Sequence, residues 1–516
     1  MLRHLFNRQE GIPWPPTRWQ DVQRKYLEWA AWYSGDPKRL AHVYQQLAFT
    51  PSPKGRFWAN NTREKKLTML HVPIAGDIST TSADLLFSEQ PDLEIPEAKQ
   101  EDAPADAINC QERLNEIIEQ NNAYSALVEA AESSSALGGT YLKVEWDNSY
   151  KPFPIIRVAQ ADAAVPKFRY GFLEEVTFYK TIETSNNNNE VWRLLEKHYI
   201  ARGPGDELYP GPEGRGVIKN ELWKGNESDL GVQKPLTAHS YTADKQELVD
   251  TGIDDIVCRY IPNMLPNKKF RDKDIGNSDY QGIEGLMDSL DEVFTNWLRD
   301  IRLSKARITV PEHWLEQAED LQGRPKMKFS EDKAIFAGMN MGPAGSESGG
   351  ADMFQPDIRS QKFKETSLEL LDRIISSAGY SPQSFGLKID GRAESGTALK
   401  ARERKSMKTK EKKERYFRSP LEDILEICLK IDRTHFPDQA DSYEVYRPRV
   451  KFADSFTVDI GEKADALQKL ERAEAASIEA KVRELHPDWS DTEVRDEIRR
   501  IKEEKGIAVD EPDLRA

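Results

Sequence analysis

The chain of 516 residues carries 73 Lys and Arg against 88 Asp and Glu, a formal net charge of −15, and 38% of its residues are hydrophobic. This length is typical of two to four domains with buried cores, and the composition excludes a chain that is disordered throughout. Proteins that hold DNA tightly by its phosphates are usually basic, so we expect at most a weak or tolerant DNA binder.

The N-terminal third has the pattern of helices. Apolar, mainly aromatic residues recur at roughly every third or fourth position from Trp19 to Tyr33, which predicts an amphipathic helix within 17–47 that is broken near Gly35 and Pro37. Pro73 precedes a second predicted helix over 74–87, and a third is expected over about 106–136, ending at Gly138.

From 139 to 262 the pattern changes to short alternating segments separated by Asn, Gly and Pro. Apolar and polar residues alternate as they do in strands with one buried face. We predict an antiparallel β region with long loops, and its strands are 141–146, 155–158, 176–179, 192–200, 217–223 and 256–261.

Two strongly apolar helices are predicted in the second half, over 279–304 and 361–378, the second ending at Gly379. Between them, 305–358 is a mixed segment with strand-like pieces and a glycine-rich loop over 341–350. The apolar stripes of the two helices include Leu290, Val293, Trp297, Leu371 and Ile375.

A polar loop, 380–394, leads to a very long predicted helix over 395–432, which is followed by a strand over 450–456 and an acidic helical tail. From Lys400 to Arg418 that helix holds ten basic and three acidic residues. Such a run indicates either contact with nucleic acid or a solvated, salt-bridged helix face, and the second interpretation is favoured.

Motifs for catalysis and metal binding are missing from the sequence. It has no phosphate-binding loop GxxxxGK[ST], no GxSxG and no HExxH, and its eight histidines are isolated. Its three cysteines, Cys110, Cys258 and Cys428, form no CxxC pair, which is consistent with a reduced, intracellular protein. Carboxylate pairs such as Asp77 with Asp84 or Asp288 with Asp291 could hold a divalent ion, but paired acids on exposed helices are common. We therefore predict no catalytic residue, no metal and no cofactor.

Targeting and membrane segments are not expected either. The first residues lack the apolar core of a signal peptide, and no stretch approaches 18 uncharged apolar residues. We expect no membrane partner.

Four segments resemble the portal, or head-to-tail connector, proteins of long-tailed double-stranded DNA bacteriophages. They are WAAWYSGDPKRLAHVY (29–44), HVPIAGDISTTSADLLFSEQPDLEI (71–95), SDYQGIEGLMDSLDEVFTNWLRDIR (278–302) and ESGTALKARERKSMKTKEKKERYF (394–417). Their order and spacing match across almost the whole chain, and the second and fourth segments are the most specific. The polar insertion at 186–189 and the loop near Gly203 are modest departures from the family's pattern.

The resemblance implies an α+β ring subunit: a wing of helices and strands, a two-helix stem, an α/β clip, a long kinked helix and a helical crown. The expected boundaries are 1–277 for the wing, 278–304 and 359–379 for the stem helices, 305–358 for the clip, 380–394 for a tunnel loop, 395–462 for the wing's long helix and strand, and 463–516 for the crown.

The resemblance also implies where the functional residues lie. The loop 380–394 occupies the place of the family's tunnel loop, so Lys388, Asp390 and Arg392 are expected to face DNA, with the two cations touching phosphates without reading bases. The stem-packing residues are expected to be Leu290, Val293, Trp297, Leu371 and Ile375.

The implied function is a structural conduit for packaging and ejecting the genome at one vertex of the capsid. Its expected partners are further copies of the chain (twelve in the capsid), non-specific double-stranded DNA, the terminase large subunit, a head-completion adaptor, and the major capsid and scaffolding proteins. We expect it in the virion, after assembly in the cytoplasm of a bacterial host. Two alternatives stay open: a metal-dependent nuclease or ATPase of the packaging machinery, and a helical adaptor without a DNA role.

Overall fold

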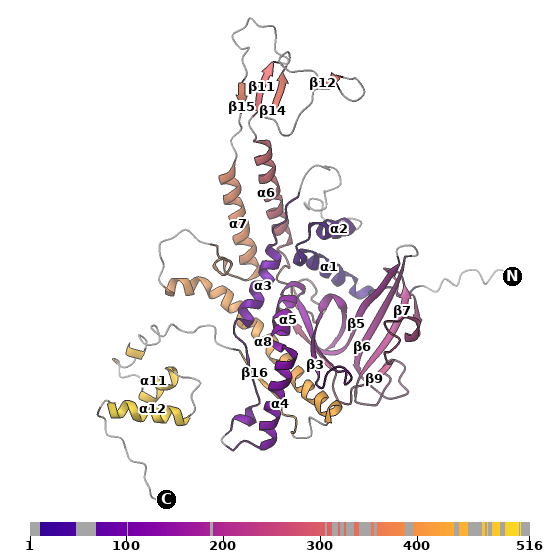
Figure 1. The fold of residues 1–516 in the computed structure, drawn as a ribbon, viewed down its shortest axis with the longest axis vertical. Coiled ribbons are helices and arrows are strands. Elements are labelled where there is room, and N and C mark those ends of the chain that lie inside the picture. Colours follow the sequence, from indigo (N-terminus) through magenta and orange to yellow (C-terminus); the bar gives the residue numbers. More distant parts are fainter. Residues whose placement is uncertain are drawn as a thin grey trace, which may run out of the picture. The chain divides into compact units, whose positions relative to one another are not determined.

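The computed structural model describes most of the chain outside its termini. The described residues are 11–47, 69–100, 102–185, 189–304, 359–387, 396–437 and 443–452, with short strands between 307 and 354 and helical pieces between 467 and 506. Contacts divide the chain into two units, Met1–Lys451 and Phe452–Ala516. Helices and mainly antiparallel sheets occur together, as expected of an α+β protein (Figure 1).

Helices open the first unit. They are α1 (Gln20–Ser34), which follows a short 3₁₀ turn, α2 (Pro37–Leu47), α3 (Ile74–Phe87), α4 (Ala105–Asn121) and α5 (Ala123–Leu137). The predicted break near Gly35 is confirmed, because this glycine takes a left-handed conformation with φ 63° and ends α1. The predicted bounds of α3 are also confirmed.

The prediction of one helix over 106–136 is wrong. Asn122 interrupts it with a left-handed backbone, φ 50°, and its N–H donates to the carbonyl oxygen of Glu119. Asparagine adopts this conformation more readily than other side-chain-bearing residues, so α4 ends here and α5 starts in a new direction.

The predicted antiparallel β region is confirmed, and it forms two separate sheets. The smaller has the order β10-β2-β3, with β2 (Gly139–Glu145), β3 (Ile155–Gln160) and β10 (Cys258–Pro262). The larger has the order β4-β5-β6-β7-β8, and β9 also pairs with β7; its strands are β4 (Ala164–Arg169), β5 (Phe172–Ser185), β6 (Glu190–Ile200), β7 (Gly216–Gly225), β8 (Val232–Lys234) and β9 (Leu248–Asp250). Contacts of Tyr141 with Phe178 and of Lys143 with Glu196 link the two sheets.

The main hydrophobic core joins these elements. Trp29 and Trp32 of α1 are fully buried in it, together with residues of α3, α5 and β2. Leu290 of α6 and Ile375 of α7 belong to the same core, so the base of the later helix pair is part of the first unit's interior.

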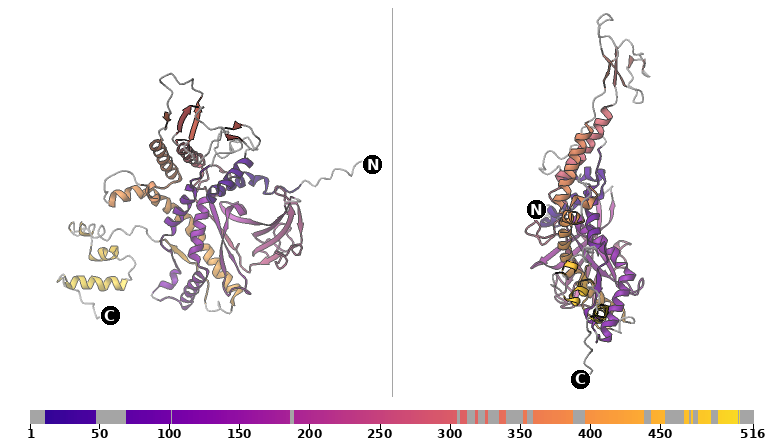
Figure 2. Two further views of the ribbon diagram at one scale, coloured as in Figure 1. Left: turned by 45° about the horizontal axis from the view of Figure 1, so that its top comes forward. Right: turned by 90° about the vertical axis from the view of Figure 1, so that its left-hand side faces the viewer.

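Two long helices, α6 (Glu284–Leu303) and α7 (Ser360–Ala378), lie side by side in every view (Figures 1 and 2). Trp297 of α6 stacks on Phe363 of α7 with 6.2 Å between ring centroids, and Arg359 pairs with Asp300 at 3.1 Å. The first helix was predicted to begin at 279 but begins at Glu284, because hydrogen bonds hold the preceding residues in turns.

The segment between these helices contains strands, as predicted. β11 (Arg307–Pro311) pairs in parallel with β14 (Ile335–Met339) and antiparallel with β15 (Asp352–Phe354). β12 (Ala318–Glu319) and β13 (Pro325–Lys326) form a separate two-stranded ladder. The glycine-rich loop 341–350 lies outside the described residues.

The long helix α8 spans Gly396–His435 and contains Pro420. Beyond it, β16 (Arg449–Lys451) pairs with β1 (Asp92–Glu94), which returns the chain to the N-terminal helices. Of the strand predicted over 450–456, residues 453–456 lie outside the described ones.

The second unit contains α11 (Ile478–Leu485) and α12 (Asp491–Glu504), so the predicted helical tail is confirmed where it is described. Among the helices that the structure describes, none combines the length and hydropathy needed to cross a membrane.

Candidate functional site

The end of α7 and the residues after it are fastened to one face of α8. Gly379 ends α7 with φ 104°, and its carbonyl oxygen accepts a hydrogen bond from Thr409 Oγ1 at 2.6 Å. Ser406 Oγ accepts the N–H of Ser381 at 2.8 Å and lies 2.9 Å from Ser384 Oγ. Because positions three and four apart share a helix face, Ser406 and Thr409 meet the segment together.

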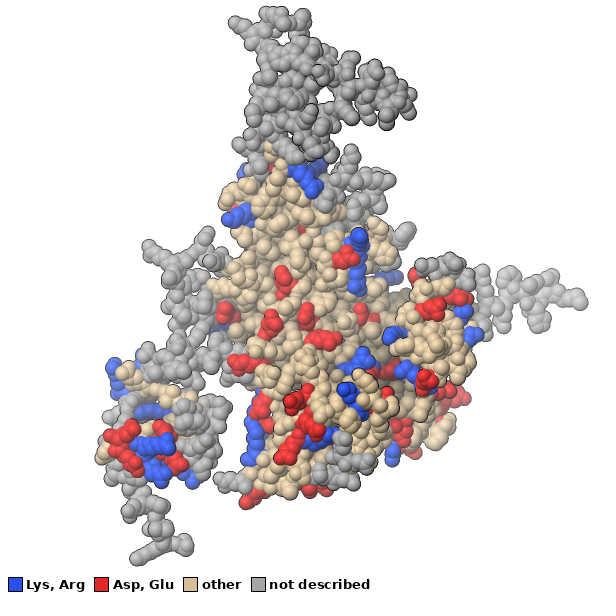
Figure 3. Space-filling view, viewed as in Figure 1, with Lys and Arg blue, Asp and Glu red and all other residues tan. Residues whose placement is uncertain are grey.

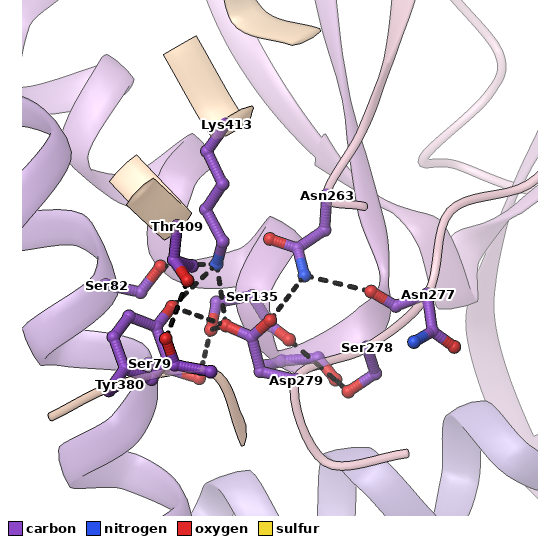
Figure 4. Close-up of polar contacts among 12 residues, drawn as sticks. Ser79, Ser82, Ser135, Asn263, Asn277, Ser278, Asp279, Tyr380, Thr409 and Lys413 are labelled. Atoms are coloured by element: carbon purple, nitrogen blue, oxygen red, sulfur yellow. Dashed lines mark hydrogen bonds and ion pairs between the residues drawn. The ribbon is translucent and has the colours of Figure 1, made fainter. Parts of the chain in front are cut away.

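Lys413, one turn further along this face, is buried (Figure 4). Its ammonium donates to Asp279 Oδ2 at 2.6 Å, Ser82 Oγ at 2.6 Å and Tyr380 OH at 2.9 Å. These acceptors satisfy the three N–H donors of a lysine. Burial lowers the pKa of Lys413 by disfavouring its charged form, and the carboxylate of Asp279 opposes that effect.

Asp279 is the centre of this polar cluster. Its Oδ2 accepts hydrogen bonds from Ser135 Oγ at 2.7 Å and Tyr380 OH at 2.8 Å, and its Oδ1 accepts from Asn263 Nδ2 at 2.8 Å (Figure 4). With the bond from Lys413, one buried carboxylate joins α5, α8, the residues after α7 and the segment that leads into α6.

The lead-in to α6 is itself fixed to α3 and α5. Ser278 Oγ donates to the carbonyl oxygen of Ala136 at 2.6 Å, and Tyr280 OH donates to that of Ala75 at 2.7 Å. At Gly138 a Cβ atom would come within 2.9 Å of the carbonyl oxygen of Gly276, so only glycine permits this close approach. The root of α6, residues 276–283, is therefore held tightly against the N-terminal helices.

Chemically, this arrangement suits a structural junction. Its carboxylate is neutralised by a buried ammonium, and neither group is accessible to a substrate. Within the part of the chain that the structure describes, no cluster of three or more His, Cys, Asp or Glu residues is arranged to hold a metal ion.

The carboxylate pairs considered as metal ligands lie elsewhere. Asp77 and Asp84 are both exposed on α3. Asp291 is fully buried, with Oδ2 2.7 Å from His71 Nδ1 and Oδ1 accepting the N–H of Val72 at 2.8 Å. Both oxygens of Asp291 thus have protein partners that fix α6 to the segment before α3.

The structure brings most of the predicted stem-packing residues to the base of the helix pair. Leu290 and Ile375 are fully buried, and Leu371 packs half-buried against the same core. Val293 and Trp297 are half-buried on α6. The predicted DNA-facing residues Lys388, Asp390 and Arg392 lie outside the described residues.

The basic run of α8 is divided between the interior and the surface. Lys410 and Lys413 are buried, and Lys410 pairs with Glu414 at 3.4 Å. Other cations on α8 are exposed: Arg404, Lys405, Lys408, Lys412, Arg415 and Arg418.

Sequence reasoning missed Lys413 and Asp279. A signal for Lys413 was present, because it is spaced four residues from both Thr409 and Phe417, which are buried on the same helix face. For Asp279 no local signal exists, since its partners come from distant segments.

The model of the family described as phage portal protein, SPP1 Gp6-like, matches residues 17–510 of this chain. No curated protein sequence matches it. Among solved structures, the chain is similar to one from the neck of an empty GTA particle computed with C6 symmetry, with 11% identity and a TM-score of 0.39, covering 79% of this chain and 87% of the other. It is also similar to a chain from the virion of a native gene transfer agent particle, with 12% identity and a TM-score of 0.37, covering 94% of both chains.

Proposed function

Because the chain belongs to the SPP1 Gp6-like family of phage portal proteins, we propose that it is one subunit of a ring that forms the DNA conduit at a capsid vertex. The match over residues 17–510 carries this proposal, since it covers at least part of every region to which we assign a role. Portal proteins are structural components of the particle, and we assign no enzymatic activity to this one.

The surface of the helix pair supports assembly into a ring. Ile301 and Leu303 near the end of α6 are 45% and 49% exposed in the single subunit, and Leu368 of α7 is 45% exposed. Exposed apolar side chains on two neighbouring helices are suited to burial against further copies. Head-to-tail contacts that close generate rings, and we propose twelve copies in the capsid.

We assign the parts of the subunit as follows. Residues 1–277 and 395–462 form the wing, 278–304 and 359–379 the stem, 305–358 the clip, 380–394 the tunnel loop, and 463–516 the crown. In this arrangement the clip emerges at one end of the ring, because it is inserted between the two stem helices.

The clip is the proposed docking surface for the terminase large subunit and, later, for a head-completion adaptor. Replacing 341–350 by a short linker should leave ring formation intact and weaken terminase binding in a pull-down. Unchanged binding would place the docking surface elsewhere.

The major capsid and scaffolding proteins are proposed to surround the ring at the vertex, within a particle assembled in the bacterial cytoplasm.

The charge of the chain suits a conduit that lets DNA slide. Duplex DNA carries about one negative charge per 1.7 Å of its axis, so a strongly basic channel would hold it by many phosphate contacts. On the described part of the face in Figure 3, acidic side chains occupy the middle and both signs are mixed below it. We propose that contacts with DNA are sparse and come from Lys388 and Arg392, with Asp390 between them.

Electron microscopy of the purified full-length chain tests the ring directly. Negatively stained particles should show rings with a central hole. A preparation that is folded but consists of single subunits at all concentrations would favour a helical adaptor instead.

A magnesium-dependent DNA cleavage assay, with Asp291→Asn as the comparison, tests the nuclease alternative, and we expect no cleavage by either protein.

A further inference from the structure

Two sets of contacts hold the segment just after α7, and they lie at different distances from the root of α6. The distal set is Ser406 with Ser381 and Ser384. The proximal set is Lys413 with Tyr380, whose hydroxyl reaches Asp279. Only the proximal set includes a residue of the α6 root.

On the premise of the ring proposed above, we propose that Asp279 and Lys413 are positioning residues that couple the residues after α7 to the root of α6. The segment 380–387 leads into the proposed DNA-facing loop, and α6 leads into the proposed clip. The pair would thus connect the channel with the helix that carries the docking end of the subunit.

The hydroxyl of Tyr380 makes this coupling cooperative. It accepts a hydrogen bond from Lys413 at 2.9 Å and donates one to Asp279 at 2.8 Å, so it serves both charged groups at once. If Tyr380 moved away, a buried ammonium and a buried carboxylate would each lose a partner. Buried charges tolerate such losses poorly, so the segment after α7 and the α6 root should shift together or not at all.

The fixed side of the junction gives the coupling a direction. The root of α6 is tied to α3 and α5 through Ser278 and Tyr280, whereas the far end of the segment after α7 continues into the loop. A displacement that begins in the loop therefore reaches α6 first through Tyr380 and the ion pair.

The test removes the distal contacts in the full-length protein and measures amide hydrogen exchange at the root of α6. Ser406→Ala removes the hydroxyl that holds Ser381 and Ser384, and Ser406 has no direct contact among the bonds that fix 276–283. We expect Ser406→Ala to accelerate exchange over 276–287 by roughly two- to thirtyfold, the usual range for coupling between sites.

The same change in a Lys413→Met background should have a much smaller effect on 276–287, because only the direct hydrogen bond of Tyr380 to Asp279 still connects the two segments. Lys412→Met is the matched control: it makes the identical substitution on the exposed face of α8, and Ser406→Ala should keep its effect there. Exchange over 190–200 in the large sheet should stay the same in every variant, which distinguishes loss of coupling from general destabilisation.

If Lys413→Met fails to fold, Tyr380→Phe replaces it, since this variant keeps the ion pair and removes only the bridging hydroxyl. Unchanged exchange over 276–287 in Ser406→Ala, or equal effects with and without the Lys413 side chain, would overturn the coupling. Microscopy of the same preparations reports ring formation separately, so a missing ring would count against the proposed function and not against this pair.

Discussion

The ammonium of Lys413 lies 2.6 Å from the carboxylate of Asp279, a residue 134 positions earlier in the chain, and both side chains are about 97% buried. This contact joins the long helix α8 to the root of α6. A buried ion pair contributes to stability only when its remaining hydrogen-bonding capacity is satisfied, and here Ser82, Ser135, Asn263 and Tyr380 provide those bonds.

We predict that Lys413→Met and Asp279→Asn each lower the free energy of unfolding by about 3–5 kcal/mol, because each leaves one buried polar or charged group without its partner. The double variant should cost clearly less than the sum of the two. Guanidinium unfolding followed by tryptophan fluorescence measures all three. Lys412→Met, on the exposed face, should change the free energy of unfolding by no more than about 0.5 kcal/mol. Additive effects would mean that the two groups do not stabilise one another.

Local features of the fold could be predicted from the sequence. The bounds of α3 and the ends of α1 and α7 depend on periodicity and on Gly35 and Gly379, which are signals contained within a few residues. The strands of the β region were recognised for the same reason. Their division into two sheets was not, because pairing depends on partners far away in the sequence.

Two misses have clear physical causes. Asn122 ends α4 although the helical pattern continues across it, since asparagine is compatible with both a helix interior and a left-handed cap. Lys413 was counted as one of ten cations in a run, and a count does not show which cation faces the core. Its partner Asp279 is identified only by the packing of α5, α7 and α8 around it.

The exposed apolar residues of the helix pair predict a variant that separates folding from assembly. Leu368→Asp should leave the melting temperature of the subunit nearly unchanged, because this side chain is 45% exposed in the single chain. It should disrupt rings, since burying a large apolar side chain at an interface is worth about 1.5–3 kcal/mol and a buried charge is unfavourable. Sedimentation velocity measures the shift toward single subunits.

Leu208→Asp is the control for this variant, because it introduces the same charge at a side chain that is 70% exposed in a loop of the large sheet. Its rings should sediment like those of the unmodified protein. Rings of normal stability in Leu368→Asp would remove this face of α7 from the subunit interface.

The contacts of Glu196, which lies between the two sheets, predict that the free energy of unfolding depends on pH. Burial alone would raise the pKa of Glu196, but His198 at 2.8 Å and Lys143 at 3.1 Å hold it well below its ordinary value of 4.5. Because this pKa is lower in the folded than in the unfolded chain, the stabilisation is fully present above about pH 4.5 and is lost as the pH falls toward the folded value.

Glu196→Gln should therefore lower the free energy of unfolding at pH 7 by about 1.5–3 kcal/mol and weaken its decline below pH 4.5. Urea unfolding between about pH 3 and pH 7 measures both effects, with the wild type as reference. Glu207→Gln, at an exposed position, should retain the wild-type profile. An unchanged profile in Glu196→Gln would show that other carboxylates govern acid unfolding.

The loop 380–394 predicts a defect that appears only when DNA is present. Lys388→Ala and Arg392→Ala together remove the cations proposed to touch phosphates, and neither residue is needed for the contacts at Ser406 and Lys413 that hold the start of the loop. Rings should form normally, while particles that carry them should contain shortened genomes or lose packaged DNA. Pulsed-field electrophoresis of DNA from purified particles measures genome length, and nuclease sensitivity after storage measures leakage. Arg404→Ala with Lys408→Ala, which removes two exposed cations from α8, is the matched control. Full-length, stably retained genomes in the loop variant would exclude Lys388 and Arg392 from DNA contact, and a defect confined to the control would assign that role to α8.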